Sequence, residues 1–304
     1  MLDVHRLGLL RELSIRGTIA AVAEALSYSP SSVSQQLSIL EREAGVPLLR
    51  KTGRLLQLTP EAHLLVDHAG RILEAIEHAE SELATASTSV TGTIRLAVFQ
   101  TALLALMPDA LRLLAERHRA LRVEMIQHEP EEALHDTWAR EFDLVIAEQY
   151  PGHAAAHHPG LDREALLSDA IELAVPTVSA IPGATEATTI AEARELPWVM
   201  EPHGAASRHW AEQACRQAGF EPDVRYETAD LQAHVRLVES GNAVALLPEL
   251  VWVHRAADVR LVPLAGAPRR TIFTATRVSA GQHPAVAAVR EALGETARGI
   301  DAAW

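Results

Sequence analysis

Residues 18–44 read TIAAVAEALSYSPSSVSQQLSILEREA, and this stretch decides how the amino-terminal part of the chain folds. It predicts two short helices joined by a tight turn at residues 27–29. The first helix, 18–26, is rich in alanine, so another helix can pack closely across it. Ser29 is expected to cap the second helix with Pro30 at its first position, where the missing N–H of proline loses no hydrogen bond. The stretch therefore predicts a helix-turn-helix.

The second helix of this motif has two chemically different faces. Its apolar residues recur every three or four positions, which places them on one buried stripe: Val33, Leu37, Leu40 and Ala44. Short hydroxyls and amides project elsewhere, and such groups can reach base edges in a major groove about 12 Å wide. The candidate DNA-binding residues of this segment are Ser29, Pro30, Ser31, Ser32, Ser34 and Gln35. A solvated polar face on an ordinary helical pair is the alternative.

The segment after this helix predicts a wing. Gly45 is expected to end the helix in the left-handed conformation. Residues 46–59 read VPLLRKTGRLLQLT and predict two short strands around a turn at Thr52-Gly53. Three basic candidates for phosphate contacts cluster here: Arg50, Lys51 and Arg54. Plain solvation of these side chains is the alternative. Residues 1–59 are thus predicted to form a winged helix-turn-helix DNA-binding domain.

The order and spacing of these residues resemble the amino-terminal part of LysR-type transcriptional regulators over residues 1–86. That family shows Ser-x-x-x-(Leu/Val)-Ser-x-Gln-(Ile/Leu), then Leu-Glu-x-x-x-Gly-x-Pro-Leu-(Phe/Leu), then Thr-Gly-Arg. The matching residues here are Ser29, Val33, Ser34, Gln36, Leu37, Leu40, Glu41, Gly45, Pro47, Leu48, Leu49, Thr52, Gly53 and Arg54. Pro30, Ser31, Ser32, Gln35 and Ala62 depart from residues common in the family. The resemblance therefore implies the docking mode on DNA but not the base preference.

A single long helix is predicted from Pro60 to about Ala86, with Thr59 as its cap. Its apolar residues are spaced four and three apart, as in a heptad seam: Leu65, Ala69, Ile72, Ile76, Ala79 and Leu83. We expect this seam to pair with a second copy of the chain, and packing against the chain's own core is the alternative. The resemblance implies that this helix joins the domains and dimerises the DNA-binding heads. Residues 60–91 are assigned to this dimerisation helix and a hinge.

From residue 92 the pattern changes to alternating strands and helices. Strands are predicted at 93–98, 122–128 and 143–147, with helices at 101–119 and 130–140 between them. This β-α-β-α-β order favours a parallel sheet with helices on its faces. A second set has predicted strands at 171–175, 197–200, 223–227 and 243–247 and helices at 207–219 and 230–240, and the chain closes with a strand at 269–277 and a helix from 283.

The fold class is therefore α/β overall, with the winged head and long helix followed by a bilobed, periplasmic-binding-protein-like effector domain over residues 92–304. The resemblance implies two crossovers between the lobes, near Asp162 and Gly266. Lobe I is placed at about 92–162 and 266–304, and lobe II at about 163–265.

Ligands of open α/β sheets bind beyond the carboxyl ends of strands, where helix amino termini offer free N–H groups. This rule marks twelve candidate effector-binding residues: Phe99, Gln100, Thr101, His128, Glu129, Glu148, Gln149, Glu201, His203, Gly204, Thr228 and Pro248. The family's effector cleft lies along the same loops. Glu129, Glu148 and Glu201 favour a ligand with an amino group, and solvated loop carboxylates are the alternative.

Composition limits the remaining possibilities. The chain has 304 residues, enough for more than one domain, and 48% hydrophobic residues exclude a disordered protein. The net charge is −13, but residues 1–59 carry seven Lys/Arg against five Asp/Glu, so a mildly basic head precedes an acidic body. No long apolar run or signal-peptide pattern occurs, which predicts a cytoplasmic, nucleoid-associated protein without membrane contact.

An enzyme is the main rival class. The sequence has no Gly-x-Ser-x-Gly elbow, no Gly-x-Gly-x-x-Gly cradle and no phosphate-binding loop with lysine, so we predict no catalytic residues and no cofactor. No metal site is predicted, since His157-His158 lacks a third ligand and Cys215 is the single cysteine. Cys215 is expected to be a packed thiol. A bilobed small-molecule-binding protein is the second rival, and it leaves residues 1–86 unexplained.

The sequence thus predicts a sequence-specific transcriptional regulator that is not an enzyme. Its expected partners are double-stranded promoter DNA, the transcription machinery, further copies of itself in a dimer or tetramer, and a small-molecule effector such as an amino acid or another polar metabolite. The effector is expected to bind in the cleft between the lobes and to modulate promoter binding.

Overall fold

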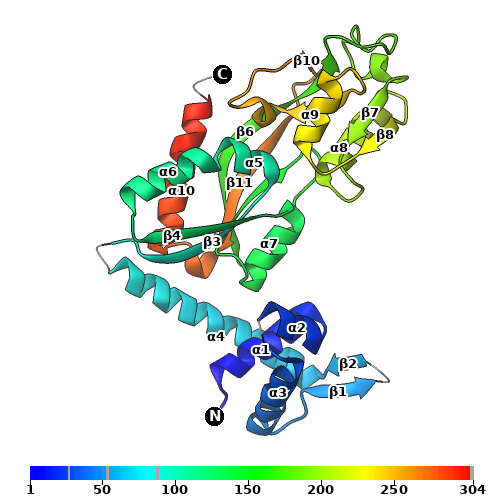
Figure 1. Ribbon diagram of the computed structural model, residues 1–304. Helices are drawn as coiled ribbons and strands as arrows, with labels where there is room; N and C mark the ends of the chain where they lie inside the picture. The colour runs from blue at the N-terminus through cyan, green and yellow to red at the C-terminus, as the bar shows by residue number, and fades with distance from the viewer. Residues whose placement is uncertain (27, 53–54, 87–88, 302–304) are drawn as a thin grey trace. The chain divides into compact units, whose positions relative to one another are not determined.

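The computed structural model describes residues 1–26, 28–52, 55–86 and 89–301, with the backbone alone at residues 51, 52, 55 and 301. Two compact units divide the chain, Met1–Ser87 and Thr88–Trp304 (Figure 1). Across the described ranges, every helix is too short or too polar to span a membrane.

The first unit is a winged helix-turn-helix followed by a long helix. Its elements are α1 Val4–Arg16, α2 Ile19–Ala25, α3 Pro30–Ala44, β1 Leu49–Thr52, β2 Leu55–Leu58 and α4 Pro60–Thr85. The two strands pair antiparallel, with Leu49 opposite Leu58. Helix α1 was not predicted from the sequence, although Asp3 caps its start by accepting from the Arg6 N–H and Gly17 ends it at φ 74°.

The predicted caps of the head are confirmed. The Ser29 hydroxyl accepts from the backbone N–H of Ser32 at 3.1 Å, and Pro30 occupies the first turn of α3. The Thr59 hydroxyl likewise accepts from the N–H of Ala62 at 3.2 Å at the start of α4. Gly45 has φ 73°, a left-handed conformation that other residues rarely adopt, so the predicted end of α3 is also correct. These local signals set where α3 and α4 begin and where α3 ends.

The apolar stripe of α3 forms the core of the head, as predicted. Val33, Leu37 and Leu40 are at most 1% exposed and pack with leucines of α1 and with the first turns of α4. Ala69 of α4 is fully buried in the same cluster, and Leu65 packs against it.

The heptad seam of α4 is therefore not one continuous surface. Its first two members, Leu65 and Ala69, belong to the head's own core because this part of α4 packs against α1. Further along, Ile72 is 37% exposed, Ile76 38% and Leu83 75%, and Ala79 is exposed as well. Pairing with a second copy stays a prediction, and within the seam it concerns Ile72, Ile76, Ala79 and Leu83.

The second unit contains a mixed sheet with helices on both sides. Its elements in lobe I are β3 Gly92–Val98, α5 Gln100–Ala105, α6 Met107–Arg117, β4 Leu121–Gln127, α7 Pro130–Ala139, β5 Leu144–Gln149, β11 Arg269–Arg277, η3 Val278–Ala280 and α10 Pro284–Asp301. Strand β3 pairs parallel with β4 and β5, as the β-α-β-α-β pattern predicts. Strand β11 lies antiparallel to β5, so the sheet is mixed.

One predicted helix is wrong. Residues 101–119 form two helices, α5 and α6, that are separated at Leu106. Pro108 explains the break, because its ring has no N–H to donate and clashes with the preceding turn of a continuous helix. Proline is tolerated in the first turn, which is where α6 places it.

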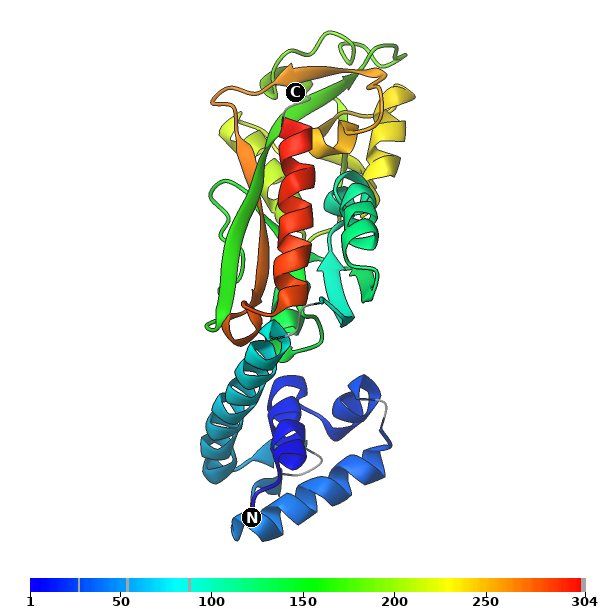
Figure 2. The ribbon, with the colours of Figure 1, turned by 90° about the vertical axis from the view of Figure 1, so that its left-hand side faces the viewer.

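The two lobes share one long strand, β6 Leu161–Pro176, which Figure 2 shows beside β11 and α10. Residues 161–170 of β6 pair with β11, and residues 171–176 pair with β9 Ala245–Pro248 and β10 Val259–Pro263. The boundary at Asp162 therefore falls inside a strand whose neighbours change between Ala170 and Ile171. Strand β10 was not predicted from the sequence.

The rest of lobe II packs around a smaller sheet. Its elements are η1 Ala191–Ala193, β7 Pro197–Met200, α8 Ala206–Gln217, β8 Asp223–Glu227, α9 Leu231–Glu239 and η2 Glu249–Trp252. Strands β7 and β8 pair parallel. Cys215 of α8 is fully buried against Trp198 and other apolar side chains, as expected for a packed thiol.

Candidate functional site

The exposed face of α3 carries the predicted DNA-reading residues. Ser31, Ser34 and Gln35 are exposed, whereas Ser32 is only partly so. The Ser29 hydroxyl caps the helix and lies 2.9 Å from the hydroxyl of Ser31. Pro30, also exposed, begins the helix. Ser29 and Pro30 therefore have a structural role at the start of α3, and base contacts by the exposed side chains of this face stay a prediction.

An interaction that the sequence analysis missed orients α3. Arg6 of α1 donates from Nε to the Gln36 side-chain oxygen at 2.9 Å and from Nη1 to Glu43 at 2.6 Å. The two acceptors lie two turns apart on the same face of α3, so one guanidinium restrains the rotation of the helix about its axis. With Gln36 turned toward α1, its neighbour Gln35 faces away from the core.

The wing is attached to α3 by a carboxylate. Glu41 Oε1 accepts from the backbone N–H groups of Leu48 and Leu49 at 2.9 and 3.0 Å. Thr59 adds a hydrogen bond from its hydroxyl to the Pro47 carbonyl at 2.9 Å. Glu41 therefore positions the wing, although the sequence analysis identified it only as part of the family motif.

The basic residues of the wing are described in part. Arg50 is exposed on β1, where a phosphate can reach it. The side chain of Lys51 and all of Arg54 lie outside the described residues. Phosphate contacts by these three residues stay predictions.

The second unit contains a cavity of about 990 Å³ beside the start of α7, the segment after β5 and the start of α8. Five of the twelve predicted effector residues line it: Glu129, Glu148, Glu201, His203 and Gly204. The other lining residues are Pro130, Glu131, Glu132, His135, Asp136, His153, Ala154, Ala155, Ala156, His158, Pro202, Ala205, Ala206, Ser207 and Ala229. The loop rule thus located this cavity, while it missed the segment 153–158.

The other seven predicted effector residues do not line this cavity: Phe99, Gln100, Thr101, His128, Gln149, Thr228 and Pro248. Thr101 is 1% exposed, and its hydroxyl accepts from Arg270 Nη2 at 2.8 Å. Gln100 accepts from the Leu231 N–H and donates to Asp230, each at 2.8 Å, and so connects the start of α5 with the start of α9. These two side chains are used by contacts within the protein.

Several others of these seven residues also have partners within the domain. The His128 ring lies 2.9 Å from Asp136, and the Thr228 hydroxyl accepts from the N–H of Asp230 at 3.2 Å. Phe99 is 5% exposed, with the guanidinium of Arg270 5.4 Å from its ring centre. Gln149 and Pro248 end strands β5 and β9.

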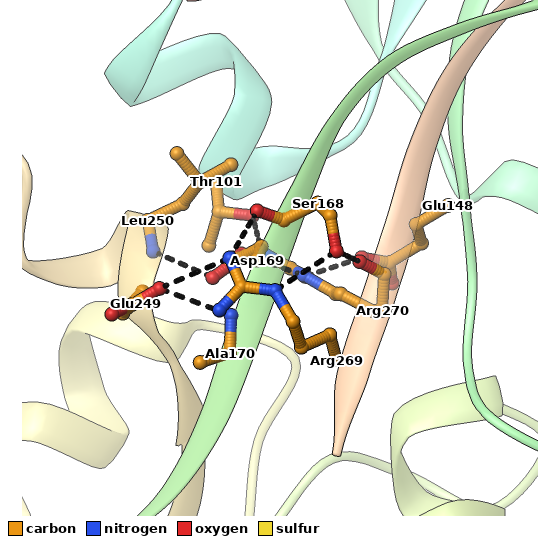
Figure 3. A network of polar contacts seen from close by, with 9 residues as sticks. All are labelled: Thr101, Glu148, Ser168, Asp169, Ala170, Glu249, Leu250, Arg269 and Arg270. Atoms are coloured by element: carbon orange, nitrogen blue, oxygen red, sulfur yellow. Dashed lines mark hydrogen bonds and ion pairs between the residues drawn. The ribbon is translucent and has the colours of Figure 1, made fainter. Parts of the chain in front are cut away.

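Arg270 is the centre of a buried polar network that Figure 3 shows. It is 1% exposed and donates from Nε and Nη2 to the same oxygen of Asp169, at 2.8 and 2.6 Å. Its Nη1 pairs with the carboxylate of Glu148, which lines the cavity. Asp169 also accepts from the Leu250 N–H at 3.2 Å. One guanidinium thus holds together residues from β5, β6, β11 and α5.

Burial controls the protonation of the cavity carboxylates. Desolvation raises the pKa of Glu148, although the neighbouring Arg270 opposes this effect. It raises the pKa of Glu201 to about 7, against the effect of the Ser207 hydroxyl that donates to this carboxylate. The pKa of Glu129 is raised by burial and by the charge of Glu132. Burial thus disfavours the ionised form of Glu201 and, against the opposing charge of Arg270, that of Glu148.

A winged helix-turn-helix and a bilobed domain with a polar cavity, on one chain, define the class of ligand-responsive transcription regulators. Comparison with protein families agrees. The LysR substrate binding domain matches residues 87–298, and the bacterial regulatory helix-turn-helix protein, lysR family, matches residues 4–63. The chain therefore belongs to the LysR family of transcriptional regulators, with a DNA-binding head and an effector-binding domain.

Relatives agree over most of the chain. The transcriptional dual regulator GltC of Bacillus subtilis (strain 168) is 27% identical over 82% of this chain and 81% of its own length. A probable hydrogen peroxide-inducible genes activator of Streptomyces viridosporus is 29% identical over 89% of this chain and 88% of its own. Full-length OxyR from Pseudomonas aeruginosa has a similar fold, with a TM-score of 0.70 at 18% identity over 96% of this chain and 95% of that one.

A structure of CbnR in complex with its target DNA is also similar, with a TM-score of 0.54 at 22% identity over 97% of this chain and all of that one.

Proposed function

We propose that this regulator contacts base edges with Ser34 and Gln35 and DNA phosphates with Arg50, Lys51 and Arg54. The observation that carries the proposal is the division of α3 into a buried stripe and an exposed Ser/Gln face. Arg6 fixes that face outward through Gln36, and Glu41 holds the wing beside it.

A promoter read in this way is a two-fold-related site, because a symmetric oligomer presents two identical heads. The exposed residues Ile72, Ile76 and Leu83 of α4 supply an apolar surface for the pairing of heads. We place this activity in the cytoplasm, on the nucleoid, with the transcription machinery as a further partner.

The proposed effector site is the cavity beside Glu129, Glu148 and Glu201, and the protein acts there by binding rather than by catalysis. In the described part of the chain, no group of three or more His, Cys, Asp or Glu side chains is arranged to hold a metal ion. A ligand can change promoter binding only by its different affinity for two arrangements of the protein. The cavity then needs only to bind its ligand with different affinities in the two arrangements.

One relative is a probable hydrogen peroxide-inducible genes activator, but a cysteine-based response to peroxide fits this chain poorly. Cys215 is the single cysteine and is fully buried. Burial raises the pKa of its thiol to about 12, so the thiolate is strongly disfavoured near pH 7. Since the thiolate is the nucleophile that attacks peroxide, Cys215 is better explained by packing.

The direct test is binding of the full chain to the DNA upstream of its own gene. Fluorescence anisotropy at several salt concentrations should show an affinity that falls linearly on logarithmic axes, with a much weaker affinity for random DNA. Footprinting should show two protected half-sites one helical turn, or a multiple of one turn, apart. Equal affinity for both DNAs would contradict sequence-specific regulation by this DNA.

A further inference from the structure

The lining of the cavity is unusually one-sided in charge. It contains six carboxylates, Glu129, Glu131, Glu132, Asp136, Glu148 and Glu201. Neither lysine nor arginine is among the described residues that line it, and its remaining titratable groups are His135, His153, His158 and His203. A negatively charged ligand would enter against these carboxylates.

The buried network behind the cavity does not neutralise this charge. Arg270 contributes one positive charge, and it is shared between Asp169 and Glu148. Asp169 receives two donors from this guanidinium, at 2.8 and 2.6 Å, and its side chain is 1% exposed. Counted as a unit, the three groups carry one net negative charge when both acids are ionised. Glu148 is the member of the unit that lines the cavity, and Arg270 offsets its charge only in part because it is shared with Asp169.

The positive ends of two helices reduce the imbalance only in part. Helix α7 starts after Glu129 and α8 starts after Ala205, both at the cavity and both without a side-chain cap. Each helix end carries about half a positive charge. Together they offset about one of the carboxylates. Asp136 is also paired with His128, which leaves the balance of the cavity negative.

We propose that the effector of this regulator is an organic cation whose ammonium or guanidinium groups are bound by Glu129, Glu148 and Glu201. The inference deepens the proposed function and rests on it, because the family assigns ligand binding to residues 87–298, which contain the cavity. A volume of about 990 Å³ is at the upper end of the range for small-molecule sites, so a metabolite fits better than a bare ion.

The protonation of the carboxylates supports this ligand class. Burial raises the pKa of all three, and the ionised forms of Glu129 and Glu148 raise the pKa of Glu201 further. A bound cation removes that mutual repulsion and takes the place of the proton. Binding of such a ligand therefore releases protons near pH 7 and strengthens as the pH rises.

The test is isothermal titration calorimetry of the full chain without DNA, at fixed ionic strength. The probes are 1,4-diaminobutane, spermidine and L-arginine, with succinate and benzoate as anionic probes and MgCl₂ as a control for weak binding of cations to an acidic protein. At least one organic cation should bind in the micromolar range, and a pair of buffers with different ionisation heats should show proton release. Succinate and benzoate should give no heat.

Variants assign the binding to this cavity. Glu201→Gln and, separately, Glu129→Gln should each weaken binding of that cation at least tenfold, whereas Glu195→Gln, an exposed carboxylate elsewhere in lobe II, should leave it unchanged. The far-ultraviolet circular dichroism of each variant checks that it folds. Two separate substitutions keep the test valid if one of them disrupts the fold.

Binding of succinate or benzoate instead of the cations would overturn the inference, and so would equal effects of Glu201→Gln and Glu195→Gln. Binding of MgCl₂ as tight as that of the amines would also overturn it. Promoter binding is measured in parallel: a chain that binds its upstream DNA but none of the cations refutes the ligand class alone. Loss of specific DNA binding refutes the proposed function instead.

Discussion

Replacing Arg270 tests how the second unit is held together. Arg270→Met keeps a side chain of similar length but leaves Asp169 and Glu148 without their shared cation. Their side chains are 1% and 11% exposed, so water cannot replace it. Removing one partner of a buried ion pair typically costs about 3–5 kcal/mol. With two carboxylates and the Thr101 hydroxyl affected, we expect a loss at the upper end of that range.

The assay is urea unfolding followed by tryptophan fluorescence. All five tryptophans lie within residues 138–304, so this signal reports the second unit without a contribution from the head. Arg269→Met is the matched control, because Arg269 is 48% exposed and lies 3.7 Å from its carboxylate partner Glu249. An exposed pair of this kind contributes about 0–1 kcal/mol.

The pH dependence of Arg270→Met separates loss of charge from loss of packing. Burial already raises the folded-state pKa of Glu148, and without the guanidinium that opposes this effect the pKa should rise further above its unfolded value. The folded variant then binds more protons than the unfolded chain, so its stability deficit should shrink as the pH falls from 8 to 5. A deficit below 1 kcal/mol, or one that does not change with pH, would refute the view that Arg270 acts by neutralising these acids.

Three further outcomes are expected. Gln35→Ala should weaken binding to the specific site by about 1–3 kcal/mol and change binding to random DNA little, as measured by fluorescence anisotropy. Equal losses on both DNAs would reject base readout by Gln35. Arg50→Ala should instead weaken binding to both DNAs and reduce the salt slope by about one. The double variant Ile72→Asp with Ile76→Asp should dissociate the oligomer, because carboxylates would face each other across the seam. An unchanged molecular mass by light scattering would show that this surface faces solvent. Glu201→Gln should flatten the pH dependence of stability. The pKa of Glu201 is raised to about 7, so its contribution to stability is complete below about pH 4.5 and is lost as the pH rises through 7. An equal change of the urea midpoint between pH 5 and pH 8 in parent and variant would contradict this.

The sequence was most informative about the head, because the relevant contacts there are local. A capping hydroxyl and its N–H partner are three residues apart, as at Ser29 and Thr59, and the stripe of α3 follows from helix geometry. The contacts of Arg6 could not be predicted from such local patterns. Its acceptors on α3 lie 30 and 37 residues away, and no local pattern specifies that distance.

The cavity shows the same limit more sharply. The rule that ligands bind beyond strand ends selected Glu129, Glu148 and Glu201, which line one cavity. It also selected Thr101, whose hydroxyl is used by Arg270, a residue 169 positions later in the chain. That contact depends on the register of β11 against β6, which strand periodicity does not reveal. Pro108, in contrast, was a local signal for the break between α5 and α6 that could have been used.

The positions of the carboxylates suggest how a bound cation could affect the protein as a whole. Glu129 follows β4 and Glu148 lies near the end of β5, and both strands belong to the main sheet. Glu201 follows β7 in the smaller sheet. When all are ionised, their repulsion acts between the two lobes. A cation between them, or protonation below about pH 7, removes that repulsion. The lobes share the continuous strand β6 and are bridged by Gln100. A ligand that relieves the repulsion favours whichever arrangement of the lobes binds it more tightly. Low pH should therefore partly mimic the cation in its effect on promoter binding.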